Sequence, residues 1–197
     1  RMTTYYEKLI EELDQKTIKV KNELKRNIVL TELQRRTIEI IASKNTKDIP
    51  ELKQKIGSIA TAWTTTYSFV TLNEFISQGL ITKVRSASLK DGLQKLQTRL
   101  VNFISGDNYI DNQYNTLIEP YFAKHINYAK TALPHYREGL IQGGPETDFE
   151  TLFNSLELWN VATFKLETTN SRINNLEELL ELITDLKLAL KEELSRN

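Results

Sequence analysis

The sequence predicts an all-α protein, an elongated helical bundle with long antiparallel first and last helices and shorter helices between them. The main observation is a stripe near the end of the chain, where mostly apolar residues recur at alternating spacings of four and three. The stripe consists of Ala162, Leu166, Thr169, Ile173, Leu176, Leu180, Ile183, Lys187, Leu190 and Leu194. A stripe of this length needs another helix to cover it, and no segment shows the sustained alternation of a strand.

A second helical period begins near the other end of the chain. Thr4 and Glu7 have the spacing of a capping box, and apolar residues continue at helical intervals as far as Ile41. We expect the first helix to run from Tyr5 to Ala42 and the last from Ser155 to Leu194. Connections of this kind favour antiparallel neighbours.

Shorter elements are expected between these two helices. Glycine, proline and polar clusters mark the boundaries. We expect a break at residues 43–48, a short helix with an irregular connection over 51–66, and a helix from Tyr67 that ends before a left-handed Gly79. A further helix capped by Ser88 should stop at residues 105–108, a helix over 109–131 should kink or split at Pro120, and residues 132–148 should form a surface connection.

Composition fits one helix-rich soluble domain over residues 1–197. Charged residues make up 26% and apolar residues 40% of the 197 residues, with seven glycines and four prolines. Basic and acidic residues number 26 each, so no net charge attracts a phosphate backbone, and we predict no nucleic-acid partner. No apolar run is long enough to span a bilayer. Because the chain begins with Arg1, we expect an upstream segment, which includes a membrane anchor.

No group of reactive side chains indicates an enzyme. The chain has no cysteine, and its two histidines, His125 and His135, are separated by a proline at a spacing that does not converge on a metal. Adjacent glutamates on a helix point about 100° apart and cannot share a substrate. We therefore predict no catalytic residue, no cofactor and no metal site.

Two aromatic-rich segments can either form core or line a small-molecule pocket, and we favour the core. They are Trp63, Tyr67, Phe69 and Phe75 in one segment and Tyr109, Tyr114, Tyr121, Phe122 and Tyr128 in the other.

Each of the two long helices has a polar zone in its apolar stripe, and the two zones should lie beside each other. With the helices antiparallel, paired positions sum to about 200, which brings two polar zones together. The zone consists of Asn27, Thr31, Gln34, Thr169 and Asn174. It is either a layer that fixes the register of the helices or a polar pocket for a ligand, and we favour the register layer.

A segment in the middle of the chain resembles an uncharacterised bacterial family of single-span membrane proteins, a domain of unknown function. The resemblance rests on residues 67–81, which read YSFVTLNEFISQGLI, on Leu89 to Leu93, on residues 5–13 and on the closing helix from Leu156 to Leu194. The chain departs from the family at Val101-Asn102-Phe103, where a tyrosine pair is expected, and it lacks the span. The resemblance implies a domain at the periplasmic face of the inner membrane, with no known activity.

These observations predict a non-enzymatic extracytoplasmic sensor or interaction domain near the bacterial inner membrane. Long paired helices suit signalling because they can transmit a small shift along their axes. The alternatives are a structural scaffold that binds a protein partner and, third, a hydrolase with an unrecognised site. A protein partner, a second copy of the chain or a small ligand remain open as partners, and membrane contact is expected only through the upstream span.

Overall fold

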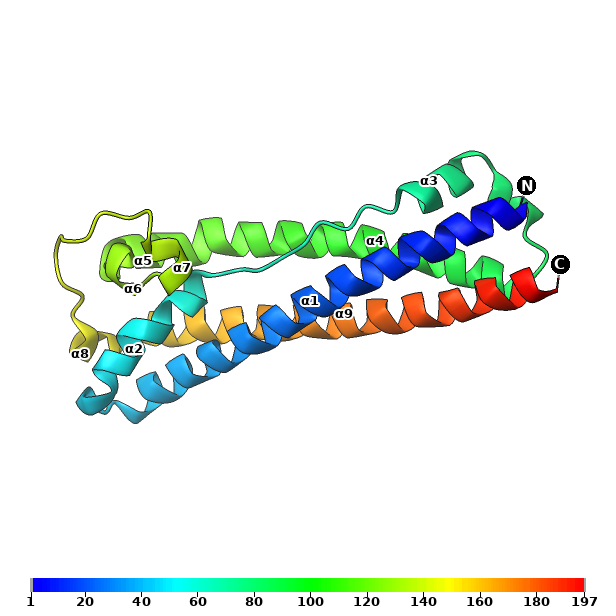
Figure 1. Ribbon diagram of the computed structural model, residues 1–197. Helices are drawn as coiled ribbons and strands as arrows, with labels where there is room; N and C mark the ends of the chain where they lie inside the picture. Colours follow the sequence, from blue (N-terminus) through cyan, green and yellow to red (C-terminus); the bar gives the residue numbers. More distant parts are fainter. Residues whose placement is uncertain (1, 197) are drawn as a thin grey trace. The chain divides into compact units, whose positions relative to one another are not determined.

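The computed structural model describes residues 2–196, and these residues contain helices but no strand. The α-helices in Figure 1 are α1 (Met2–Ser43), α2 (Ile49–Lys55), α3 (Val70–Ser77), α4 (Ala87–Gln113), α5 (Glu119–His125), α6 (Tyr128–Thr131), α7 (Pro134–Arg137), α8 (Phe149–Leu152) and α9 (Leu156–Ser195). Three 3₁₀ segments are η1 (Thr46–Asp48), η2 (Ile56–Ala60) and η3 (Leu80–Lys83), and a π-helical turn is η4 (Tyr114–Ile118). The all-α prediction is confirmed.

The contacts group the residues into two compact units. The first unit comprises residues 2–25, 64–106 and 174–196, and the second comprises Arg26–Trp63 and Asp107–Ile173. The sequence predicted one domain over 1–197, and each of α1, α4 and α9 contributes residues to both units.

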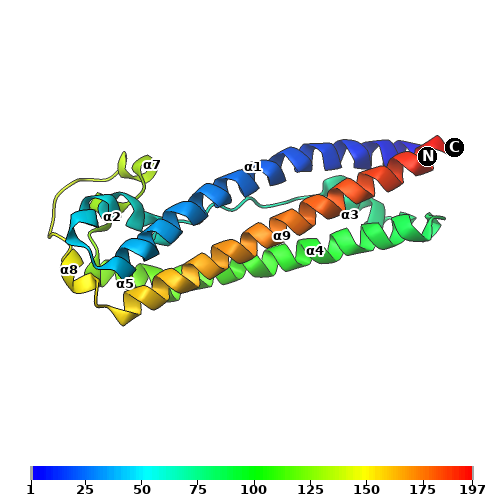
Figure 2. The same cartoon turned by 90° about the horizontal axis from the view of Figure 1, so that it is seen from below.

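In the first unit, the start of α1 packs against the end of α9. Leu9 and Leu13 of α1 share a buried cluster with Ile183 and Leu190 of α9. The ammonium of Lys187 lies 2.8 Å from the Asp14 carboxylate, so α1 and α9 are antiparallel there, as predicted (Figure 2).

A carboxylate of α1 determines where α3 begins. The Glu12 carboxylate accepts hydrogen bonds from the backbone N–H groups of Thr71, at 2.9 Å, and Leu72, at 3.1 Å. These N–H groups belong to the first turn of α3, which has no intrahelical partner for them. The helix therefore begins at Val70, three residues after the predicted start, and Gly79 has the predicted left-handed conformation with φ 69°.

The predicted stop at residues 105–108 is wrong, because α4 continues to Gln113. Phe103 and Ile110, on either side of this polar run, are both buried, so packing outweighs the local preference for a turn. The predicted cap is also wrong, since the Ser86 hydroxyl, and not that of Ser88, accepts from the Leu89 N–H at 3.2 Å.

Pro120 interrupts the helix in a way that the sequence suggested only in part. In the second unit, α4 is followed without a loop by η4 and then by α5, whose first turn contains Pro120. A proline inside an α-helix clashes with the carbonyl four residues earlier, and the wider π-helical turn gives that carbonyl room. The helix predicted over 109–131 ends at His125, and α6 follows separately.

The second unit surrounds its own buried cluster with short helices. Ile40 and Ile41 of α1 pack with Leu158, Val161 and other residues of α9, and Figure 1 shows α2, α5, α6, α7 and α8 gathered in this unit. η2 approaches the backbone of residues 131–133 so closely that a Cβ on Gly57 would overlap the Thr131 carbonyl oxygen and lie 2.9 Å from the Leu133 nitrogen.

Gly57→Ala is expected to lower the free energy of unfolding by about 2 kcal/mol or more, because the added methyl meets rigid backbone atoms. Urea unfolding measures the change. The matched control is Gly106→Ala inside α4, where a Cβ meets nothing within 4 Å. This control should raise stability by about 0.5–1 kcal/mol, since alanine is the better helix former. Equal effects at both positions would contradict the close approach at Gly57.

Candidate functional site

Residues 58–63, which we call the strap, comprise the end of η2 and the start of the irregular connection that follows it, and two side-chain amides of α1 hold them. The Asn27 side-chain NH₂ donates to the Trp63 carbonyl at 2.9 Å, and the Gln34 side-chain NH₂ donates to the Ser58 carbonyl at 3.1 Å. Asn27 is 3% exposed and Gln34 is fully buried. The Ser58 carbonyl also accepts from the Thr61 N–H at 3.3 Å, so Gln34 adds a second donor there, whereas Asn27 supplies a donor to the Trp63 carbonyl, which lies outside regular structure.

The polar zone predicted from the sequence is therefore only partly present. Asn27, Thr31, Gln34 and Thr169 are buried, whereas Asn174 is exposed and its assignment to the zone is wrong. Asn174 directly follows the stripe residue Ile173, so its side chain points about 100° away from the stripe, toward solvent. The Thr31 and Thr169 hydroxyls each donate to a carbonyl four residues earlier in their own helix, at 2.8 and 3.1 Å.

A cavity of about 270 Å³, which we call the strap pocket, lies in the second unit. The strap forms one wall, and the end of α4, the π-helical turn and the two short helices α6 and α7 form the others. The lining residues are Ala60, Thr61, Ala62, Ile110, Asp111, Tyr114, Asn115, Tyr128 and Tyr136.

Contacts within the second unit hold these walls in place. The Trp63 indole N–H donates to the Tyr136 hydroxyl at 2.8 Å, which ties the strap to α7. The guanidinium of Arg26, a residue of α1, lies 5.1 Å from the centroid of the Trp63 ring and makes a cation–π contact with it. The Thr61 hydroxyl donates to the Gly57 carbonyl at 2.7 Å and stiffens the turn before the pocket.

Two tyrosines of the strap pocket, Tyr114 and Tyr128, have raised pKa values and remain protonated well above neutral pH. Burial, with the nearby Glu119 carboxylate as a further cause, raises the pKa of Tyr114, and burial and the neighbouring Tyr136 raise the pKa of Tyr128. Asp111 is the one charged side chain among the nine lining residues, and it is exposed at the rim. The pocket therefore offers aromatic rings, neutral hydroxyls and one negative charge.

Lys165 is a buried cation that the sequence analysis missed. It is 3% exposed, and burial lowers the pKa of its ammonium to about 8. Gln113 of α4 lies beside the same turn of α9, because its side-chain NH₂ donates to the Thr168 hydroxyl at 2.9 Å. The available signal was the position of Lys165 on α9, four residues after the buried Val161 and four before the buried Thr169.

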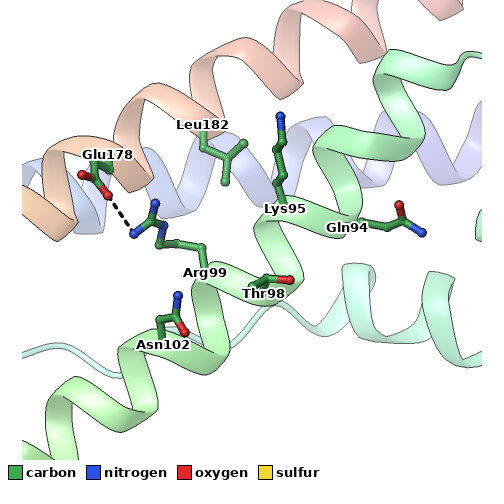
Figure 3. Close-up of a pocket in the computed structure, with 7 residues that line it drawn as sticks. All are labelled: Gln94, Lys95, Thr98, Arg99, Asn102, Glu178 and Leu182. Atoms are coloured by element: carbon green, nitrogen blue, oxygen red, sulfur yellow. Dashed lines mark ion pairs between the residues drawn. The ribbon is translucent and has the colours of Figure 1, made fainter.

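A hollow in the first unit has paired charges. It has a volume of about 430 Å³ and lies between α4 and α9 (Figure 3). The Arg99 guanidinium reaches the Glu178 carboxylate at 2.7 Å, and the Lys95 ammonium bonds Asp91 at 2.8 Å. Since both cations are already paired and the lining side chains are mostly exposed, the hollow is a solvated groove between helices.

The histidines lie in separate surroundings. The His125 ring contacts the Tyr121 ring in a tilted arrangement, with centroids 4.6 Å apart, and the His135 ring contacts the Tyr136 ring edge to face. Residues 2–196 contain no group of three or more histidine or acidic side chains placed to hold a metal ion. Within the same residues, no helix combines the length and apolar character that a membrane span requires.

Comparisons of the chain with protein-family models, with curated proteins and with solved structures gave no match. The resemblance to the single-span membrane family, and the location that it implies, therefore stay predictions.

Asn27→Leu is expected to lower the free energy of unfolding by about 1–3 kcal/mol, because the Trp63 carbonyl loses its donor. Denaturant unfolding measures the change, and Asn22→Leu, at an exposed position of α1, is the control with an expected change within about 0.5 kcal/mol. A register layer predicts the opposite sign, since leucine would then replace a buried amide with packed apolar atoms. Higher stability of Asn27→Leu would support the register layer.

Lys165→Met is expected to stabilise the protein at pH 7 by up to roughly 3 kcal/mol, because the native state no longer buries an ammonium. The native pKa of about 8 lies below the ordinary lysine value, so the wild type gains stability as the pH rises above about 8. The advantage of the variant should therefore shrink between about pH 7 and 9.5. Melting temperatures of the wild type and of Lys165→Met, measured across this pH range, test the prediction.

The control for this experiment is Lys191→Met, at an exposed position of α9. Its effect should be small and independent of pH. An advantage of Lys165→Met that is the same at both ends of the range would contradict the buried charge.

Proposed function

We propose that this chain is a non-enzymatic helical sensor domain that binds a small ligand in the strap pocket. The observation that supports the proposal is the strap pocket itself, whose walls combine an irregular segment, a π-helical turn and three tyrosines. Pockets that bind small ligands are concave and largely aromatic or apolar, with a few polar groups. Turns of π-helix inside α-helices occur frequently at functional sites.

The strap gives a bound ligand a direct route to α1. One side of the strap lines the pocket through Ala60 and Ala62, and its Ser58 and Trp63 carbonyls are bonded to α1 by Gln34 and Asn27. A ligand that displaces the strap must stretch or break these two hydrogen bonds. A ligand that fits the resting strap stabilises them, so occupancy of the pocket changes how firmly this part of α1 is held.

The chemistry of the lining favours binding over catalysis. General acid–base work needs positioned groups that exchange protons near the working pH, and Tyr114 and Tyr128 have raised pKa values. Asp111 lies at the exposed rim, with no second titratable group among the nine lining residues other than tyrosine. As for location, the resemblance in residues 67–81 is what supports a place at the periplasmic face of the inner membrane.

A protein-binding module is the second candidate, and an exposed apolar surface of the second unit favours it. Leu156 is 73% exposed and Trp159 is 38% exposed. Both line a shallow hollow of about 420 Å³ together with Phe153 and Ile41. Exposed apolar patches of this kind mark interaction surfaces in many proteins.

A fragment screen followed by ¹⁵N-resolved NMR tests the proposal. Neutral, cationic and anionic fragments are added to the protein, and we expect shift changes that centre on residues 60–62, 110–115, 128 and 136. Ala62→Phe should fill the pocket and abolish these changes. The control Ala42→Phe, at an exposed position of α1 that lines the hollow of Leu156 and Trp159 and not the strap pocket, should leave them intact.

The screen separates the two candidate functions. Shift changes centred on Leu156 and Trp159, unaffected by Ala62→Phe, would support the partner-binding module. Absence of any fragment that perturbs the strap pocket would overturn the sensor proposal.

A further inference from the structure

The strap pocket selects ligands by charge as well as by shape. Its nine lining residues contain no lysine, arginine or histidine, and Asp111 is the one acidic residue among them. The remaining polar atoms are the hydroxyls of Thr61 and three tyrosines and the amide of Asn115. An anionic ligand would meet the Asp111 carboxylate without a compensating cation in the lining.

The tyrosine rings also favour a positively charged ligand. Tyr114 and Tyr128 are half-buried, Tyr136 lies nearer the solvent, and all three line one cavity of about 270 Å³. The faces of tyrosine rings carry negative electrostatic potential and attract cations within about 6 Å. The raised pKa values of Tyr114 and Tyr128 keep these residues neutral, so the attraction comes from rings and not from phenolates.

We propose that the strap pocket takes a small organic cation, with an alkylated ammonium among Tyr114, Tyr128 and Tyr136 and its charge balanced by Asp111. This inference rests on the proposed function and specifies its ligand class. An alkylated ammonium suits the pocket better than a metal ion, because one carboxylate at the rim is too few ligands for a metal. Its methyl groups pack against Ile110 and the rings, and its charge needs no further hydrogen bond.

Choline and its neutral carbon isostere, 3,3-dimethylbutan-1-ol, have nearly the same shape and differ in charge. NMR titration of the protein with each compound measures binding at the residues of the strap pocket. We expect choline to bind at least about tenfold more tightly than the isostere, which corresponds to about 1.4 kcal/mol from the charge. Asp111→Asn should weaken choline binding about three- to tenfold and leave the isostere unchanged.

Two further variants separate the rings from the hydroxyls. Tyr128→Phe keeps the ring and should retain most of the choline affinity, whereas Tyr128→Leu removes the ring and should abolish the preference for choline over the isostere. Asp185→Asn, at an exposed position of α9 in the first unit, is the control for a general change of charge and should have no effect.

The outcomes distinguish this inference from the proposed function. Equal affinities for choline and the isostere, or fragment hits in the strap pocket that do not include choline, would overturn the cation preference and leave the sensor proposal standing. If neither compound nor any fragment binds there, both proposals fail.

Discussion

The connection between η2 and α3 depends on polar side chains of α1, because residues 61–69 have no regular structure to pair their backbone groups. In the first unit, the carboxylates of Glu12 and Glu23 accept from backbone N–H groups of residues 65, 71 and 72. In the second unit, the amides of Asn27 and Gln34 donate to backbone carbonyls of the strap. The carboxylates accept from backbone N–H groups and the amides donate to backbone carbonyls. The type of each side chain therefore matches the backbone group to which it is hydrogen-bonded.

This dependence explains why α1 carries buried polar side chains in each unit. The step from Glu12 to Glu23 in the first unit and the step from Asn27 to Gln34 in the second are near multiples of the 3.6-residue turn, so the two side chains of each pair point in similar directions. An apolar residue in place of Glu12, Glu23 or Asn27 would remove a hydrogen-bond partner from the backbone of the connection, at about 1–3 kcal/mol for each group left unpaired. Because these side chains hold the connection in a non-helical conformation, there is room for the strap pocket beside it.

Much of the fold could be predicted from periodicity, whereas the site could not. The first and last helices, their antiparallel packing in the first unit and the left-handed Gly79 all follow from local patterns. The predicted stop near Gly106 failed because burial of Phe103 and Ile110 outweighs turn preference. The sequence analysis also identified Asn27 and Gln34 as unusual. Their partners, however, are backbone carbonyls of the strap, and a sequence does not show which backbone carbonyls lie near a given side chain. Tyr114 and Tyr128 were predicted as core, and they do pack against the buried cluster of the second unit, but each also lines the strap pocket, which depends on the path of the strap.

Two departures of the second unit from ordinary packing lie where the strap is attached to α1. Among the described residues, the Gln34 side-chain oxygen and the Ser58 hydroxyl are buried without a hydrogen-bond partner. η4 adds a π-helical turn at the tyrosines. Each feature costs stability, and proteins tolerate such departures mainly where function requires them. Ser58 and Gln34 belong to the strap and its attachment, and η4 lines the cavity, which is why the strap pocket, and not the charge-paired groove of the first unit, is the place to look for a ligand.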